Sequence, residues 1–211
     1  MIADYPESGK KSGDTFLPGF TPLLITMVGL NDENLQILFV PPWENASAEH
    51  WMSIWQEKYR KIRRVEQRDW MNPDRNEWIA ALDRSVGEQK KPVILVAHSL
   101  GTMAVAHWAD KFKREIRGAF LVAPPDVEST DAPAEIKNFA PVPRTAFKFP
   151  SVVVASETDV YCSIDRAVFF ARSWNSGFIN IGSAGHINTK SGHGEWLEGE
   201  RLLSEFIEQN R

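Results

Sequence analysis

The pentapeptide Ala97-His98-Ser99-Leu100-Gly101 carries the most suggestive chemistry in this sequence of 211 residues. An apolar run (93–96) precedes it and a helix-compatible run (102–106) follows it. A serine on a sharp turn between a strand and a helix presents its hydroxyl above the carboxyl edge of a sheet, where a nucleophile is needed. The G-x-S-x-G pattern of such turns differs here at Ala97, by one methyl group. Ser99 is therefore the candidate nucleophile, and the structural alternative is a serine that caps an ordinary turn.

A serine hydroxyl needs a base to accept its proton, and the five candidates are His50, His98, His107, His186 and His193. His98 adjoins Ser99 and must point elsewhere, and His107 lies about two helical turns away. His50 stands at the start of a tryptophan-rich stretch, where a structural role is expected. His186 follows the last predicted strand in a loop of small residues, which would bring it over the sheet edge. We favour His186, with His193 in the same loop as its rival.

The acid that orients this histidine should follow a strand that lies between serine and histidine in the chain. Asp159 comes directly after the apolar run 152–156 and fits this order. Asp126 follows the preceding predicted strand and is the alternative, and either carboxylate could simply belong to a turn. The sequence favours Asp159.

Stabilising the negative charge of a tetrahedral intermediate requires two backbone N–H groups. Leu100, next after the candidate nucleophile, should supply one of them. The other should come from the loop after the run 36–40, where Trp43 is the candidate because proline at positions 41 and 42 has no N–H. The stretch 28–31, a second strand-then-glycine turn, is the alternative source.

Short apolar runs alternate with amphipathic stretches from residue 35 onward, which indicates strands and helices around a parallel sheet. The predicted strands are 36–40, 62–66, 93–97, 119–123, 152–156 and 178–181. Five helices are predicted: 48–59, 73–87, one that starts near Ser99, 165–174 and 196–208. The second is capped by Asn72, has Pro73 at its first position and ends at Gly87. These elements form one domain, 35–211, preceded by an arm (1–34) in which 23–28 could add a strand. The segment 124–150 contains six prolines and is too short for a lid domain.

Composition narrows the classes of partner. The formal net charge is −4 without a basic run, which argues against nucleic acid. Cys162 is the only cysteine, which rules out an intrachain disulfide and suits a reducing cytoplasm, where we place the protein. The apolar stretch 16–30 is broken by prolines and too short to cross a bilayer, so we expect no membrane association. A small acyl compound is the expected ligand, and a protein partner stays open.

The chain from about residue 35 onward resembles the small serine hydrolases that include retinoblastoma-binding protein 9 and the bacterial YdeN-like proteins. The matching motifs are Glu49-His50-Trp51, Arg64-Val65-Glu66-Gln67-Arg68-Asp69-Trp70, Glu77-Trp78, the Ser99 pentapeptide, Val122-Ala123-Pro124-Pro125-Asp126, Asp159 with Tyr161-Cys162-Ser163, Gly185-His186-Ile187-Asn188 and Ser191-Gly192. The chain departs from the family where Pro42 replaces a glycine and Val160 a proline.

This resemblance implies an α/β-hydrolase fold: a mostly parallel sheet of about six strands, helices on both faces and no large lid. It also implies the strand order 62–66, 36–40, 93–97, 119–123, 152–156, 178–181, a triad of Ser99, Asp159 and His186, and no cofactor or metal. We therefore predict a carboxylesterase-like serine hydrolase that cleaves small esters or related acyl compounds through an acyl-enzyme. An interaction protein that keeps the fold with little or no activity is the alternative.

Overall fold

The computed structural model describes residues 29–211. Its strands are β1 (Gln36–Val40), β2 (Arg63–Arg64), β3 (Val93–His98), β4 (Gly118–Val122), β5 (Ser151–Ala155) and β6 (Gly177–Asn180). Its α-helices are α1 (Trp51–Lys58), α2 (Arg75–Gly87), α3 (Leu100–Lys111), α4 (Ile164–Trp174) and α5 (Leu197–Gln209), and three short 3-10 helices are η1 (Gly29–Asn31), η2 (Ala134–Phe139) and η3 (Thr189–Ser191). The predicted arm falls mostly outside the described residues, including the proposed strand 23–28.

The six strands form one parallel sheet in the order β2-β1-β3-β4-β5-β6, which is the predicted order. The direction of winding reverses between β1 and β3, and open α/β sheets place their sites at the carboxyl edge beside such a reversal. Five strands lie within one residue of their predicted bounds. The exception is β2, predicted as 62–66, which is only two residues long. The fold is therefore that of an α/β hydrolase.

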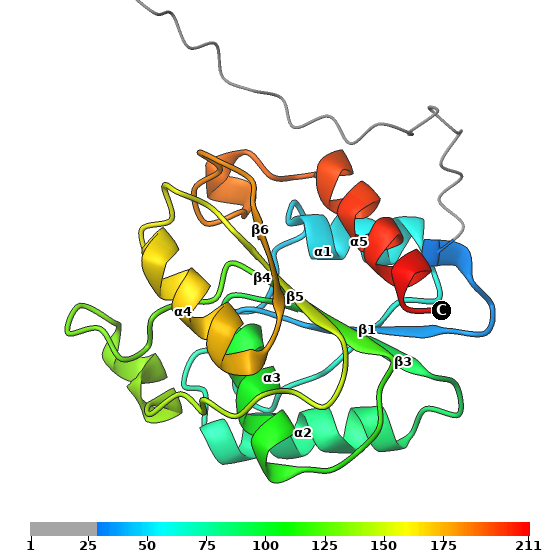
Figure 1. The fold of residues 1–211 in the computed structure, drawn as a ribbon, viewed down its shortest axis with the longest axis horizontal. Coiled ribbons are helices and arrows are strands. Elements are labelled where there is room, and N and C mark those ends of the chain that lie inside the picture. The colour runs from blue at the N-terminus through cyan, green and yellow to red at the C-terminus, as the bar shows by residue number, and fades with distance from the viewer. Residues whose placement is uncertain (1–28) are drawn as a thin grey trace, which may run out of the picture.

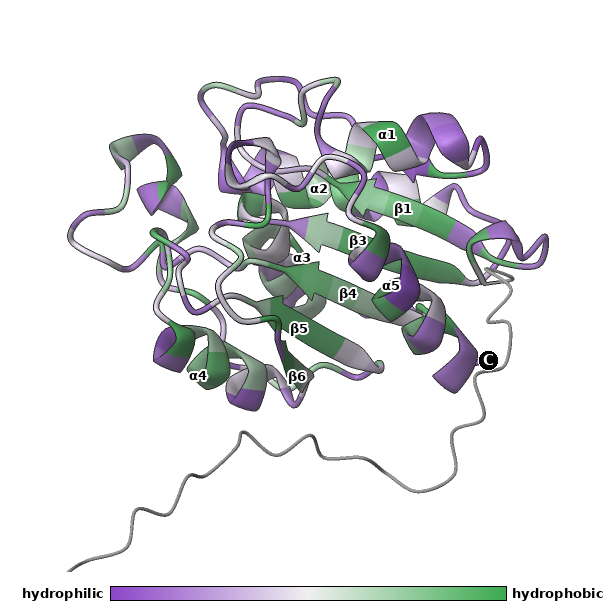
Figure 2. Ribbon diagram, turned by 90° about the horizontal axis from the view of Figure 1, so that it is seen from above, coloured by the Kyte–Doolittle hydropathy of each residue, from purple (hydrophilic) through white to green (hydrophobic). Residues whose placement is uncertain are grey.

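Helices cover both faces of the sheet (Figure 1), and each face has its own apolar core. Helices α2, α3 and α4 pack on one face, and α1 and α5 on the other. Successive residues of strand β3 point to opposite faces of the sheet, so Leu95 belongs to the first core, whereas Ile94 and Val96 belong to the second. Figure 2 shows the central strands as hydrophobic over most of their length, between helices with more polar surfaces. A strand apolar on both faces fits a position inside such a sandwich.

Helix α2 begins later than predicted. Asn72 was the expected cap, but the N-cap is Asp74, whose side chain accepts the backbone N–H of Glu77 at 2.9 Å. Asn72 instead belongs to a turn closed by Asp69, which accepts its backbone N–H at 2.9 Å. Both residue types are good caps, so their identity alone did not decide between them.

The proline-rich segment 124–150 contains one regular element, η2, beside helix α3. His107 on α3 donates its Nε2–H to the Phe139 carbonyl at 2.6 Å and so fixes η2. No helix among residues 29–211 is both long and apolar enough to cross a membrane.

Candidate active site

Ser99 occupies a strained turn between β3 and α3. Its backbone has φ 51° and ψ −124°, a region that residues other than glycine rarely adopt. The turn also requires Gly101, because a Cβ there would lie 2.1 Å from the Val40 carbonyl oxygen at the end of β1. The close passage of β1 and α3 therefore puts the loop after β1 beside the Ser99 hydroxyl.

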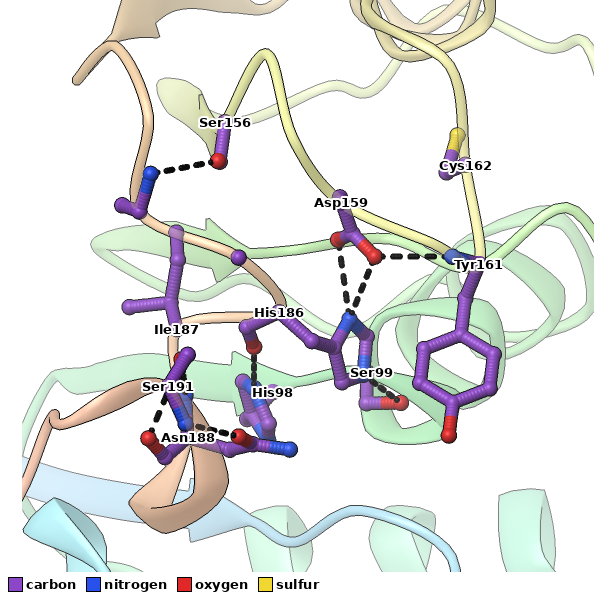
Figure 3. A network of polar contacts seen from close by, with 12 residues as sticks. His98, Ser99, Ser156, Asp159, Tyr161, Cys162, His186, Ile187, Asn188 and Ser191 are labelled. Atoms are coloured by element: carbon purple, nitrogen blue, oxygen red, sulfur yellow. Dashed lines mark hydrogen bonds and ion pairs between the residues drawn. The ribbon is translucent and has the colours of Figure 1, made fainter.

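His186 and Asp159 complete a line of hydrogen bonds with Ser99 (Figure 3). The distance from His186 Nε2 to Ser99 Oγ is 2.8 Å, and His186 Nδ1 lies 2.8 Å and 3.0 Å from the two Asp159 carboxylate oxygens. A carboxylate only accepts, so Nδ1 carries the proton and Nε2 is free to accept that of the serine. The side chains of His186 and Asp159 are only 8% and 3% exposed, which shields their interaction from water.

Backbone and hydroxyl groups hold the two loops that carry these residues. Tyr161 donates its backbone N–H to Asp159 Oδ1 at 2.9 Å. Ser156 Oγ accepts the N–H of Ala184 at 2.9 Å, and Thr158 Oγ1 accepts that of Gly185 at 3.0 Å. The loop after β5 is thereby tied to the loop after β6, which keeps the carboxylate and the imidazole in register.

The two rival residues lie elsewhere. His193 Nδ1 lies 3.1 Å from Ser191 Oγ, within its own loop. The Asp126 carboxylate forms an ion pair with Arg166 at 3.1 Å, and the Asp126 backbone N–H donates to the Tyr161 carbonyl. Both rivals therefore have partners that account for their positions without any contact with Ser99.

The loop after β1 reaches the same pocket. Trp43 and Leu100 both line it together with Ser99, and neither backbone N–H has a hydrogen-bond partner among residues 29–211. Two hydrogen bonds hold this loop in place. The Trp43 indole N–H donates to the Met71 carbonyl at 2.9 Å, and the Glu44 backbone N–H donates to the Trp70 carbonyl at 3.1 Å. Of the alternative donor stretch 28–31, only residues 29–31 are described; they form η1, which packs against α5.

The pocket over Ser99 has a volume of about 490 Å³ and two kinds of wall. Its apolar wall comes from Trp43, Leu100, Pro125, Pro133, Ile136 and Tyr161. Its polar wall comes from Glu44, Asn45, Ser47, Asn188, Thr189 and Lys190. A ligand with an apolar and a polar part matches such a pocket.

Several residues at the site appear in the sequence analysis only as parts of motifs, without a role. The Tyr161 ring stands edge-on to His186 with centroids 4.6 Å apart and is 47% exposed in the pocket. Trp51 and His98 donate hydrogen bonds to the loop that carries His186. The place of Tyr161 beside Asp159 in the chain could have indicated its role, whereas Trp51 has its partner 136 residues away and no local signal.

Cys162 lies buried three residues after Asp159. Burial, together with the negative charges of Asp159 and Asp126, raises the pKa of its thiol from 9.0 to about 12. The thiol therefore stays protonated and is a poor nucleophile at neutral pH.

Comparisons with known proteins agree with this fold. A sequence profile described as serine hydrolase matches residues 37–205. The structure of a YdeN-like hydrolase from Pectobacterium atrosepticum is 30% identical, with a TM-score of 0.77 over 86% of this chain and 96% of that one. The YdeN protein of B. subtilis (16% identity, TM-score 0.69, 82% and 98%) and an esterase domain from Rhodothermus marinus (17%, 0.61, 84% and 89%) share the fold. No curated protein sequence matches this chain.

Proposed function

Because this chain belongs to the serine hydrolase family, we propose that it is a carboxylesterase-like enzyme that cleaves small esters or related acyl compounds with Ser99 as nucleophile. The observation that carries the proposal is the unbroken line from Asp159 through His186 to Ser99, with both shorter contacts at 2.8 Å. A buried serine that merely capped a turn would need neither a histidine at hydrogen-bonding distance nor a buried carboxylate behind it.

The reaction follows from this line of bonds. Ser99 Oγ attacks the substrate carbonyl carbon while its proton passes to His186 Nε2, and the Asp159 carboxylate stabilises the imidazolium that forms. The backbone N–H groups of Leu100 and Trp43 bind the oxyanion. The intermediate then expels the alcohol, which takes the proton from His186. Water attacks the acyl-enzyme by the same steps in reverse order and releases the carboxylic acid and Ser99.

The pocket supports a small substrate with unlike ends. Its volume of about 490 Å³ is in the lower part of the range for small-molecule sites. The apolar wall, which includes Ile136 of η2, suits a short hydrocarbon group, and the polar wall, which includes both Glu44 and Lys190, suits a hydroxylated group. Esterase, monoacylglycerol lipase and thioesterase structures are among its distant neighbours, which fits an acyl ester or thioester.

Labelling with a fluorophosphonate probe and hydrolysis of 4-nitrophenyl esters test the proposal. The wild type should label and turn over ester, and Ser99→Ala should lose labelling and at least about 10³-fold in kcat, because no other group replaces the nucleophile. Ser173→Ala is the matched control, since its hydroxyl binds the Phe169 carbonyl on α4. A wild type that neither labels nor hydrolyses ester would favour an interaction protein.

A further inference from the structure

The turn that carries His186 is strained. Gly185 has φ 58° and Ile187 has φ 49°. Glycine adopts such angles freely, but a β-branched isoleucine in the left-handed region costs roughly 1–3 kcal/mol. A conformation of this cost persists only where its surroundings enforce it. Neighbouring groups must therefore hold Ile187, and with it the His186 ring.

Two buried side chains bind successive carbonyl groups of this turn. His98 Nε2 lies 3.0 Å from the His186 carbonyl oxygen (Figure 3), and Trp51 Nε1 lies 2.9 Å from that of Ile187. Both side chains are almost fully buried, at 1% and 0% exposure. They come from different elements, since His98 ends β3 and Trp51 begins α1. The turn is thus fixed from the sheet and from the helix above it.

We propose that His98 and Trp51 are positioning residues that aim His186 at Ser99 by holding the two carbonyl groups of its strained turn. The inference rests on the proposed function, because it concerns how the base of that reaction is placed. Misplacing a catalytic group by about 1 Å can cost about 10²-fold in rate. Loss of either donor should therefore lower kcat. Substrate binding should be largely kept when Trp51 is replaced, because Trp51 does not line the pocket, whereas His98 does.

The same geometry fixes the proton positions of His98 and of His50 beside it. A carbonyl only accepts, so His98 carries its proton on Nε2, and its Nδ1 is a buried atom without a partner among the described residues. His50 Nδ1 accepts the Met52 N–H at 3.2 Å, so its proton is on Nε2, which is likewise buried and unpartnered.

The two imidazole rings pack against each other, with centroids 4.8 Å apart and planes tilted by 58°. His50, at the start of α1, therefore contacts the residue that supports His186. Burial lowers the pKa of both histidines, helped for His50 by Arg64 and His186 and for His98 by His50, His186 and His193. Both therefore stay neutral, as this arrangement requires.

Two tryptophans on one helix provide a matched test. Trp51→Phe removes the N–H given to Ile187, and Trp55→Phe, one turn later, removes an N–H given to the Glu195 carbonyl at 2.7 Å, outside the strained turn. On a 4-nitrophenyl ester, Trp51→Phe should lower kcat about 10- to 100-fold with KM changed less than about 3-fold. Trp55→Phe should keep kcat within about 3-fold. Equal kcat values for the two variants would overturn the role of Trp51.

Conservative replacement tests His98. Glutamine can present an amide N–H near the place of the imidazole Nε2–H, whereas leucine fills similar space without a donor. His98→Leu should lower kcat about 10- to 100-fold, and His98→Gln should recover most of that loss. Equal losses in the two variants would overturn the donor role. Thermal midpoints of all four variants, measured alongside, separate loss of fold from loss of positioning.

The proton positions are read directly from nitrogen-15 spectra of histidine-labelled wild type. His50 and His98 should both be neutral and protonated on Nε2 at pH 7, and an Nδ1-protonated or doubly protonated His98 would overturn the arrangement. Failure of the proposed function can be told apart from failure of this inference. If the proposed function failed, the wild type would show no labelling that depends on Ser99. Failure of this inference would instead leave the labelling rates of Trp51→Phe and His98→Leu at the wild-type value.

Discussion

Asp159 and Asp126 both follow strand ends, yet their carboxylates meet different partners. Asp159 faces His186 Nδ1, and Asp126 faces Arg166. Asp159→Asn should lower kcat by about 10³- to 10⁴-fold, because an amide cannot hold the imidazole with its proton on Nδ1.

Asp126→Asn is the control for this change. It should keep kcat within about 3-fold and cost no more than about 1 kcal/mol of stability, since the ion pair is partly exposed. Ester hydrolysis and chemical denaturation of the two variants check both values. If Asp126→Asn lost its activity and Asp159→Asn kept it, Asp126 would be the residue that orients His186.

The pH dependence of activity should follow one imidazole. His186 accepts the Ser99 proton only when its Nε2 is unprotonated, so kcat/KM should fall when acid protonates this ring. His50 and His98 should add no step near neutral pH, because burial lowers the pKa of both, to about 3 for His50. A pH–rate profile tests this, and an acid limb that steepens to two protons would contradict it.

The chemistry-bearing residues were accessible from the sequence because each sits at a strand end. The turn around Ser99 and the small-residue loop before His186 are local patterns, and the chain order restricted the acid to two aspartates. The supporting donors were not accessible in this way. Trp51 and His98 bind carbonyls 136 and 88 residues away, so tryptophan at that position indicated only core packing.

At the scale of elements, the loop after β1 has a rigid proline at the position where the family has glycine. Pro42 stands where the family has glycine, and its carbonyl accepts the Asn45 N–H at 3.1 Å while the Trp43 indole is bound to Met71. Pro42→Gly should lower kcat severalfold, because it loosens a loop whose Trp43 N–H is proposed to meet the oxyanion. Steady-state kinetics on a 4-nitrophenyl ester measure the effect. A higher kcat in Pro42→Gly would mean that the proline impairs the oxyanion hole.

Strand positions were more predictable than strand lengths or helix starts. Runs such as 93–97 are apolar on both faces, and the family resemblance supplied their order. The run 62–66 shortened to Arg63–Arg64, although Ile62 and Val65 on either side of it are buried in the two cores. Asn72 and Asp74 are both capping residues two positions apart, and Asp69 decided between them by binding the Asn72 N–H in a turn.

For the molecule as a whole, buried histidines make stability depend on pH. Burial lowers the pKa of His50 from 6.5 to about 3, so below pH 6.5 the unfolded chain binds a proton there that the folded chain does not. Stability from this residue is therefore complete above about pH 6.5 and is lost as pH falls toward 3, at up to about 1.4 kcal/mol per pH unit. His98 should act in the same direction.

His50→Asn isolates this contribution. Asparagine keeps an oxygen that can cap α1 but does not titrate. Urea denaturation between pH 6.5 and 5, above the range of most carboxylates, should show a smaller loss of stability with falling pH in the variant. An unchanged slope would show that His50 takes up its proton in the folded state as well.

The single thiol is buried within the loop that carries Asp159, which gives this protein an internal reporter of opening. Because Cys162 is buried and its pKa is about 12, an alkylating reagent at neutral pH reacts only with molecules whose Asp159 loop has come away from the core. A fluorophosphonate records intact sites in the same sample. The ratio of the two adducts would therefore count closed and opened molecules at once, without any engineered label.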